Sequence, residues 1–161
     1  HALRTAIYMF LIGIIADVDK EFLKSMVLAA FAHDIGRKYS SSQRHGLIGA
    51  NMLEGYVDLP KCDINLIKKA ITAHSIDDYT LYMDINNEST KDKLLIQWLK
   101  DVDTLDYIRF GVKEYNPSLI KTEEARKLVK LAGELNLYME VFPNNDYKIL
   151  KWDVKDNEFK L

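Results

Sequence analysis

The chain has 161 residues, 48% of them hydrophobic, with 22 basic and 24 acidic residues and a formal net charge of −2. This near balance gives no signal for binding to nucleic acid or to a membrane surface, so any recognition of anions must be local. The length suits one domain, and the lone Cys62 excludes an internal disulfide. A single free thiol fits a reducing compartment, and the cytoplasm is the expected location.

The N-terminal residues are apolar at helical spacing and predict a buried helix over residues 1–16. The longest apolar run within it, at residues 6–16, is shorter than the roughly 20 residues that a membrane-spanning helix needs. We therefore expect a soluble chain without a membrane partner.

A His-Asp pair stands at the end of the second predicted helix, for which Asp17 or Asp19 can serve as the N-cap. The apolar periodicity of this helix continues to His33, and Asp34 follows directly. Gly36 is expected to let the helix stop. A neutral imidazole and a carboxylate are natural ligands for a divalent metal, although the pair alone also fits a hydrogen bond at a helix end.

The middle of the chain continues the helical pattern. Residues 37–44 are polar and predict a loop, and residues 45–56 predict a third helix. Asp63 is expected to cap a fourth helix that ends near His74. Residues 75–89 predict an irregular loop that is long enough to form a lid.

Thr90 is expected to cap a long helix that runs to about Ile108 and carries Asp101, Asp103 and Asp106 along or beside its apolar stripe. An acidic residue within that stripe calls for a functional explanation.

Two further elements are predicted in the C-terminal third of the chain. Residues 122–135 predict a well-capped structural helix. Residues 150–161 alternate apolar and polar residues around a turn at 155–157 and predict a small hairpin.

The histidines share one feature: all four fall at or near the ends of predicted helices, at His1, His33, His45 and His74. With Asp34 and Asp103 they supply ligands from five predicted helices toward one pocket. Such a set suffices for two divalent cations, and the carboxylate of Asp34 is suited to bridge them.

The order of these residues resembles the HD-domain metal-dependent phosphohydrolases, in which an early histidine precedes a His-Asp pair and a later aspartate. The matching segments are His1 in His-Ala-Leu-Arg-Thr-Ala, His33-Asp34 in Ala-His-Asp-Ile-Gly-Arg, and Asp103 in Lys-Asp-Val-Asp-Thr-Leu-Asp-Tyr-Ile-Arg. His45 and His74 look like the additional histidines of subfamilies that hold a second metal. The resemblance covers roughly residues 3–110.

The resemblance and the predicted elements together indicate an all-α fold, a compact multi-helix HD-domain bundle formed by residues 1–161 as one domain. Residues 1–110 would form the helical core that carries the metal site. Residues 111–161 would add a helix and an irregular or hairpin tail.

The resemblance also implies a ligand set for one or two divalent ions, with Mn, Mg, Zn, Fe, Ni and Co all open as the metal. One ion would be held by His1, His33, Asp34 and Asp103. The second would be held by Asp34, His45 and His74.

Asp103 is preferred to its acidic neighbours because the family's ligand precedes a small residue and a leucine, here Thr104-Leu105. Helical spacing agrees, since Asp103 shares a face with Leu99 and Val102. By the same spacing, Asp101 does not lie on that face.

Several site residues have a second interpretation. His1 is either the family's first histidine, in a chain that begins partway into a longer protein, or the remnant of a purification tag. His45 is alternatively a first-turn histidine and His74 a buried structural one. Arg4 and Arg109 either hold a ligand carboxylate or form a salt bridge with Asp106 or Asp101.

The expected catalytic groups are Asp34, through the metals, and Arg37, as the cation that holds phosphate oxygens. Arg37 lies just past the metal pair, where family members often carry Lys or Arg; its alternative is a solvated loop charge. Lys38 and Arg44 are better interpreted as solvated charges. Lys100 and Arg109 are further cations close to the ligands in sequence that could contact phosphate oxygens.

The predicted function is hydrolysis of a phosphate monoester or diester, in a nucleotide or another small phosphorylated compound, by a metal-activated water. Two alternatives are an HD-fold di-iron oxygenase and a non-catalytic HD module that senses a ligand. The substrate, the native metal and the oligomeric state stay open at this point.

Overall fold

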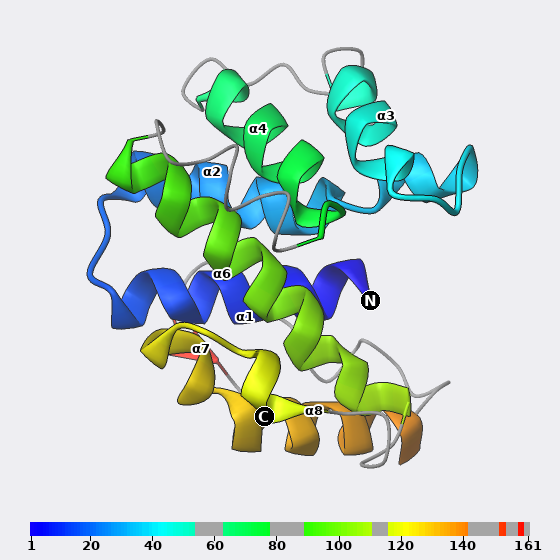
Figure 1. Cartoon of the computed structure of the whole chain (residues 1–161). Coiled ribbons are helices and arrows are strands. Elements are labelled where there is room, and N and C mark those ends of the chain that lie inside the picture. Colours follow the sequence, from blue (N-terminus) through cyan, green and yellow to red (C-terminus); the bar gives the residue numbers. More distant parts are fainter. Residues whose placement is uncertain (54–62, 78–88, 111–115, 142–151, 154–157, 160–161) are drawn as a thin grey trace.

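The structure is a computed structural model of the whole chain, shown in Figure 1. Side chains are described as far as residue 136 within the described ranges. The described residues are 1–53, 63–77, 89–110, 116–141, 152–153 and 158–159. The predicted end of the third helix, most of the predicted loop at 75–89 and the turn of the predicted hairpin lie outside these ranges.

Helices α1 (Ala2–Ile15) and α2 (Lys20–Ala32) pack against each other, as Figure 1 shows. Of the two predicted caps, Asp19 is the one that caps α2, since its carboxylate accepts the Phe22 N–H at 2.8 Å. Tyr8 and Met26 are fully buried between these helices and the rest of the core. The pairing brings residue 1, at the start of α1, near the end of α2.

Gly36 does not end α2, contrary to the expectation from the sequence. The helix ends at Ala32, and Gly36 lies inside a short 3-10 helix, η1 (Ile35–Lys38). A Cβ atom at Gly36 would collide with the His45 carbonyl oxygen and lie 2.6 Å from the Gly49 nitrogen. Glycine is therefore required here because η1 packs directly on the backbone of the next helix.

The predicted loop at 37–44 is also shorter than expected, because η1 takes in its first two residues. Helix α3 (Arg44–Met52) follows and packs against α4 (Ile64–His74). Asp63 caps α4 as predicted, accepting the Leu66 N–H at 3.0 Å. Gly46 permits the close contact of α3 with α4, since a Cβ there would lie 2.6 Å from the Ile71 carbonyl oxygen.

Helix α6 (Thr90–Asp106) crosses α1, α2 and α4 and continues into the 3-10 helix η4 (Tyr107–Phe110), as Figure 1 shows. Its N-cap is Ser89 rather than the predicted Thr90, because the Ser89 hydroxyl accepts the Asp92 N–H at 3.1 Å. The apolar side of α6 is buried in the core, at Leu95, Leu99, Val102 and Leu105.

The C-terminal helix predicted at 122–135 is divided in two. After the 3-10 helix η5 (Pro117–Leu119), α7 (Glu123–Arg126) and α8 (Val129–Val141) are separated at residues 127–128. The Leu128 N–H bonds to the Ala125 carbonyl, three residues back, so the α-helical ladder is interrupted there. Thr122 precedes α7 without capping it through its side chain.

Two short strands, β1 (Trp152–Asp153) and β2 (Glu158–Phe159), pair antiparallel with Trp152 opposite Phe159, within the segment where a hairpin was predicted. The predicted all-α class is confirmed, since helices form the core of the described residues. In the described part of the chain, no helix has the length and apolar character needed to cross a bilayer.

Candidate metal centre

Helix ends bring all six predicted ligand residues into one cluster. His1 directly precedes α1, and His33 directly follows α2. His45 lies in the first turn of α3, and His74 is the last residue of α4. Three of these histidines, His33, His45 and His74, are less than 7% exposed, so their ring nitrogens need partners within the protein or a bound ligand. The carboxylates are those of Asp34, directly after His33, and Asp103, on α6.

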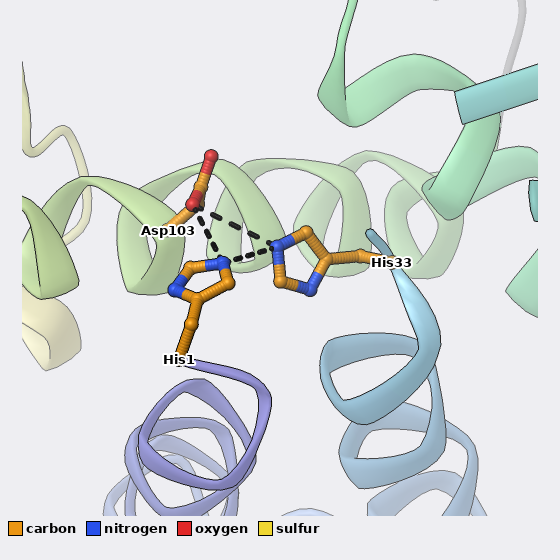
Figure 2. Close-up of side chains that lie close together, drawn as sticks. All are labelled: His1, His33 and Asp103. Carbon is orange, nitrogen blue, oxygen red and sulfur yellow. Dashed lines mark hydrogen bonds and ion pairs between the residues drawn. The ribbon is translucent and has the colours of Figure 1, made fainter. Parts of the chain in front are cut away.

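The first half of the centre consists of His1, His33 and Asp103, which point toward one another in Figure 2. The Nε2 atoms of His1 and His33 are 2.9 Å apart. Asp103 Oδ1 lies 3.4 Å from His1 Nε2 and 3.7 Å from His33 Nε2. These donor atoms lie close enough together to share one ion.

The second half consists of His45 and His74, whose Nε2 atoms are 3.0 Å apart. Asp34 joins this half to the first, because each of its oxygens faces a different half. Oδ1 lies 3.2 Å from His45 Nε2 and 3.5 Å from His74 Nε2. Oδ2 lies 3.3 Å from His1 Nε2 and 3.7 Å from His33 Nε2.

Backbone carbonyls fix the imidazole tautomers of three histidines. The Nδ1 atoms of His33, His45 and His74 lie 2.7, 2.7 and 2.5 Å from the carbonyl oxygens of Ala30, Ser42 and Ile71, respectively. A carbonyl only accepts, so each Nδ1 carries the hydrogen and each Nε2 presents its lone pair to the cluster. Facing lone pairs at about 3 Å repel each other unless a proton or a cation is shared, so the donor set fits divalent cations.

Asp34 supplies a second sign that the cluster fits a cation. Its Oδ1 is buried and accepts no hydrogen bond among the described residues, although Arg37 Nε lies 2.6 Å away as an ion pair. Burial alone would raise the pKa of Asp34, but the neighbouring imidazoles of His1 and His74 and the guanidinium of Arg37 lower it to well below the usual range for a carboxyl. The carboxylate is therefore ionised at any pH where the imidazoles are ligands.

His1 is held differently from the other three histidines, through the fully buried carboxylate of Asp106. The His1 Nδ1 donates to Asp106 Oδ2 at 2.7 Å, and Arg4 donates to both oxygens at 2.5 and 3.0 Å. Arg109 also donates to Oδ2. Burial would lower the pKa of His1, but the bonds to Asp106 and Asp34 raise it to about 9.

Sequence reasoning had named Asp106 only as a salt-bridge partner. The structure agrees with the salt-bridge interpretation of Arg4 and Arg109, with Asp106 as the partner of both, and this carboxylate in turn orients His1. Burial would raise the pKa of Asp106, but His1 and Arg4 keep it below its usual range. The sequence feature that could have indicated this role of Asp106 is its spacing: Asp103, Asp106 and Arg109 are three residues apart and lie along one helix face.

Asp101 has a structural position away from the cluster. It is 1% exposed and accepts the Thr122 hydroxyl and N–H at 2.6 and 2.8 Å and the Lys121 N–H at 3.1 Å. Asp103, in contrast, faces the histidines, as the helical spacing predicted. Burial would raise the pKa of Asp103, but the neighbouring imidazole of His33, together with His1 and His74, outweighs this and lowers that pKa overall.

A polar cavity of about 340 Å³ adjoins the centre. One residue of each half, Asp103 and His74, forms part of its wall. The remaining lining residues come from α6, from η4 and from the segment before α7: Gln97, Lys100, Thr104, Tyr107, Asn116, Leu119 and Lys121.

The basic residues near the ligands differ in where they lie. Arg37 pairs with Asp34 and keeps its side chain 45% exposed, at the edge of the cluster. Lys38 and Arg44 are exposed, which agrees with the interpretation as solvated charges. Lys100 lines the cavity and donates to the Ile76 carbonyl at 2.5 Å.

Comparison with protein families gives one result: a model described as HD domain matches residues 1–111. The match takes in every predicted ligand and ends before the cavity residues Asn116, Leu119 and Lys121. No curated protein and no solved structure matches the chain.

Proposed function

This chain belongs to the HD-domain family, whose members are typically metal-dependent hydrolases, and from that premise we propose that it hydrolyses a phosphate ester. The substrate is a nucleotide or another small phosphorylated compound. The observation that carries the proposal is the position of Asp34, whose two oxygens face separate pairs of imidazoles. A carboxylate in that position is suited to join two divalent cations.

The ligand assignment follows the two halves. His1, His33, Asp34 and Asp103 would hold one cation, and Asp34, His45 and His74 would hold the other. Bound there, the cations would supply a nucleophilic water near neutral pH and would neutralise charge on the attacked phosphoryl group.

The protein's own contribution is to fix the donors before substrate arrives. Carbonyl oxygens hold the rings of His33, His45 and His74, so that each lone pair stays directed at the cluster. Asp106 holds the fourth ring and makes it more basic through a charged hydrogen bond. This prior ordering reduces the reorganisation that accompanies the reaction.

Arg37 is assigned to the phosphate oxygens that do not react. Its guanidinium is half exposed at the edge of the cluster, and it carries several N–H donors in a planar fork. Cations bound to Asp34 would neutralise its charge and weaken its ion pair with Arg37, so that the Arg37 donors would be available to an anionic substrate. The expected effect of Arg37→Ala is a loss of turnover with metal content unchanged.

The test compares hydrolysis of p-nitrophenyl phosphate and bis(p-nitrophenyl) phosphate across a set of divalent metals. The variant Asp34→Asn removes one charge from the cluster, and Asp17→Asn is its matched control. Asp17 is exposed and has a φ of 50°, a conformation that asparagine tolerates well. We expect turnover by the wild type and by D17N, and only background hydrolysis by D34N.

Three results would contradict the proposal. Turnover by D34N equal to the wild type would remove Asp34 from the reaction. Absence of turnover with every metal would favour the ligand-sensing alternative. A mixed-valence iron signal in the purified chain would favour the di-iron oxygenase instead.

A further inference from the structure

Helix α1 is apolar on its exposed side as well as on its buried side. Its buried side contributes Tyr8, Met9 and Ile12 to the core, all of them fully buried. A helix that is apolar all round is normally buried all round. In α1, however, every exposed residue is apolar: Leu3, Ile7, Phe10, Ile14 and Ile15. The exposed side of α1 therefore has the composition of a contact surface.

A groove of about 630 Å³ lies beside this surface, between α1 and α2, which run side by side in Figure 1. Phe10 of α1 and Phe31 of α2 line the groove and are 46% and 56% exposed. Two lysines also line it, Lys20 and Lys24, and the Lys24 ammonium is paired with Glu21 at 3.1 Å. The other described lining residues are all apolar, so the groove fits an apolar occupant.

The spacing of the exposed residues on α1 is that of a seam between two helices. Leu3, Ile7, Phe10 and Ile14, here called the α1 stripe, follow one another at intervals of four, three and four residues, as in a coiled coil. This order of intervals is the same in both directions. If a second copy of α1 lies antiparallel about a two-fold axis, Leu3 of one copy faces Ile14 of the other, and Ile7 faces Phe10. The α1 stripe is thus complementary to itself.

The area of the surface is sufficient for a dimer. The residues of the α1 stripe and Phe31 are each 36–57% exposed. Aromatic side chains bury roughly 150–250 Å² each and aliphatic ones less, so these five present on the order of 400 Å² per copy. Because apolar atoms make up about 65% of a homodimer interface, two facing copies would bury on the order of 1,200 Å² in total. Specific, stable interfaces begin at about this size.

Charge also agrees with contact between two copies. The α1 stripe carries no charged side chain, so two stripes that face each other do not repel. Lys20 follows the C-terminal end of α1, so an antiparallel pairing places the two copies of Lys20 at opposite ends of the interface.

We propose that this surface binds a second copy of the chain, with the two α1 stripes packed antiparallel about a two-fold axis. Helices α1 and α2 of both copies then form a four-helix bundle. His1 and His33 stand at the ends of these two helices, so the dimer steadies the elements that carry two ligands of the first half of the metal centre. The dimer does not depend on the proposed hydrolysis.

Sedimentation velocity of the full chain at micromolar concentrations measures the oligomeric state. The wild type is expected to be a dimer. Ile7→Glu places an unpaired carboxylate at the middle of the interface and is expected to weaken dimerisation about a hundredfold or more. Leu131→Glu is the matched control, because Leu131 is 37% exposed on α8 and Ile7 is 36% exposed. This control is expected to dimerise like the wild type.

Cross-linking tests the direction of the pairing. Leu3→Cys and Ile14→Cys are made in a Cys62→Ser background, which removes the only native thiol. A short bis-maleimide is expected to link a mixture of the two variants and neither variant alone, because two copies of residue 3 lie about 16 Å apart along antiparallel helices. These variants add no charge, so they test the interface even if circular dichroism shows that I7E does not fold.

A wild type that stays monomeric at micromolar concentrations would overturn the proposal, and so would a dimer that persists in folded I7E. A monomer that sediments with phosphatidylcholine vesicles and loses this binding in I7E would assign the surface to lipid, which also overturns it. Cross-linking of L3C alone would show parallel stripes and reject the two-fold arrangement.

Discussion

The two halves of the metal centre differ in how one histidine is held: backbone carbonyls fix His33 in the first half and both histidines of the second, but not His1. In the first half, His1 is fixed by the ionised, fully buried Asp106, which Arg4 and Arg109 hold in turn. In the second half, His45 and His74 are fixed only by neutral backbone carbonyls. Charge thus raises the basicity of a ligand in the first half, whereas helix packing positions the ligands of the second.

This difference predicts that the halves respond to different perturbations. A change of buried charge or of pH acts on the first half, and a change in the packing of α3 on α4 acts on the second. Asp34 is the exception because its two oxygens face both halves.

The largest effect is expected from Asp34→Asn, which removes the shared carboxylate. Both halves lose an anionic ligand, so the variant is expected to retain less than one metal per chain where the wild type retains two. Metal content after gel filtration, measured by elemental analysis, checks this. Asp17→Asn is expected to retain the wild-type content, and two tightly held metals in D34N would contradict the shared role.

Asp106→Asn is expected to weaken metal binding in the first half about 10- to 100-fold, the usual range for losing a hydrogen-bonded partner of a ligand. Titration calorimetry should show one weakened site and one unchanged site. Asp101→Asn is the matched control, because Asp101 is equally buried on the same helix and contacts no histidine. Equal metal affinity in D106N and D101N would contradict the role of Asp106.

The pH dependence of metal binding should also separate the halves. The pKa of His1 is raised to about 9, so below that pH the metal-free protein holds a proton that the first metal must displace. The affinity of the first half for a metal is expected to rise about tenfold per pH unit from about pH 7 to 9. One proton is displaced for each metal bound, and one pKa unit corresponds to a factor of ten. Burial lowers the pKa of His74, so that residue adds no slope in this range.

Titrations at three pH values in this range check the prediction, with Asp106→Asn as the control that should reduce the slope. If the metal affinity of the first half of the centre did not change with pH in the wild type, the assignment of His1 to that half would be contradicted.

The smallest effect on metal binding is expected from Gly46→Ala. The new Cβ would meet the Ile71 carbonyl oxygen at 2.6 Å, so α3 must move away from α4. Overpacking of this kind costs about 1–3 kcal/mol, and the shift should weaken only the second half. Gly133→Ala is the control, because its Cβ would meet Ile108 Cδ1 at an ordinary 3.4 Å. Urea unfolding of the metal-free variants measures the cost, and unchanged stability in G46A would contradict the close contact.

The sequence predicted what depends on local patterns. Asp63 was identified as a cap, and Asp19 as one of two possible caps, because a side chain accepting from a nearby N–H is a short-range property. The ligand set was identified because the four histidines stand at or near helix ends and because their order, with Asp34 and Asp103, resembles the family's pattern. The structure brings this set together.

What the sequence did not predict depends on contacts between distant segments. The role of Gly36 is set by the backbone of α3, and Thr122 donates its hydroxyl to Asp101 instead of capping α7. The role of Asp106 depends on its hydrogen bond with His1, a residue 105 positions earlier in the chain. Asp101 likewise accepts the N–H of Lys121, a cavity-lining residue 20 positions later in the chain.

The central claim, that Asp34 joins two cations, is tested most directly by electron paramagnetic resonance of the chain loaded with two equivalents of Mn²⁺. A shared carboxylate brings the ions close enough for exchange coupling. We predict a coupled spectrum for the wild type and an isolated-ion spectrum for His74→Ala, which removes one ligand of the second half. An isolated-ion spectrum for the fully loaded wild type would contradict the claim.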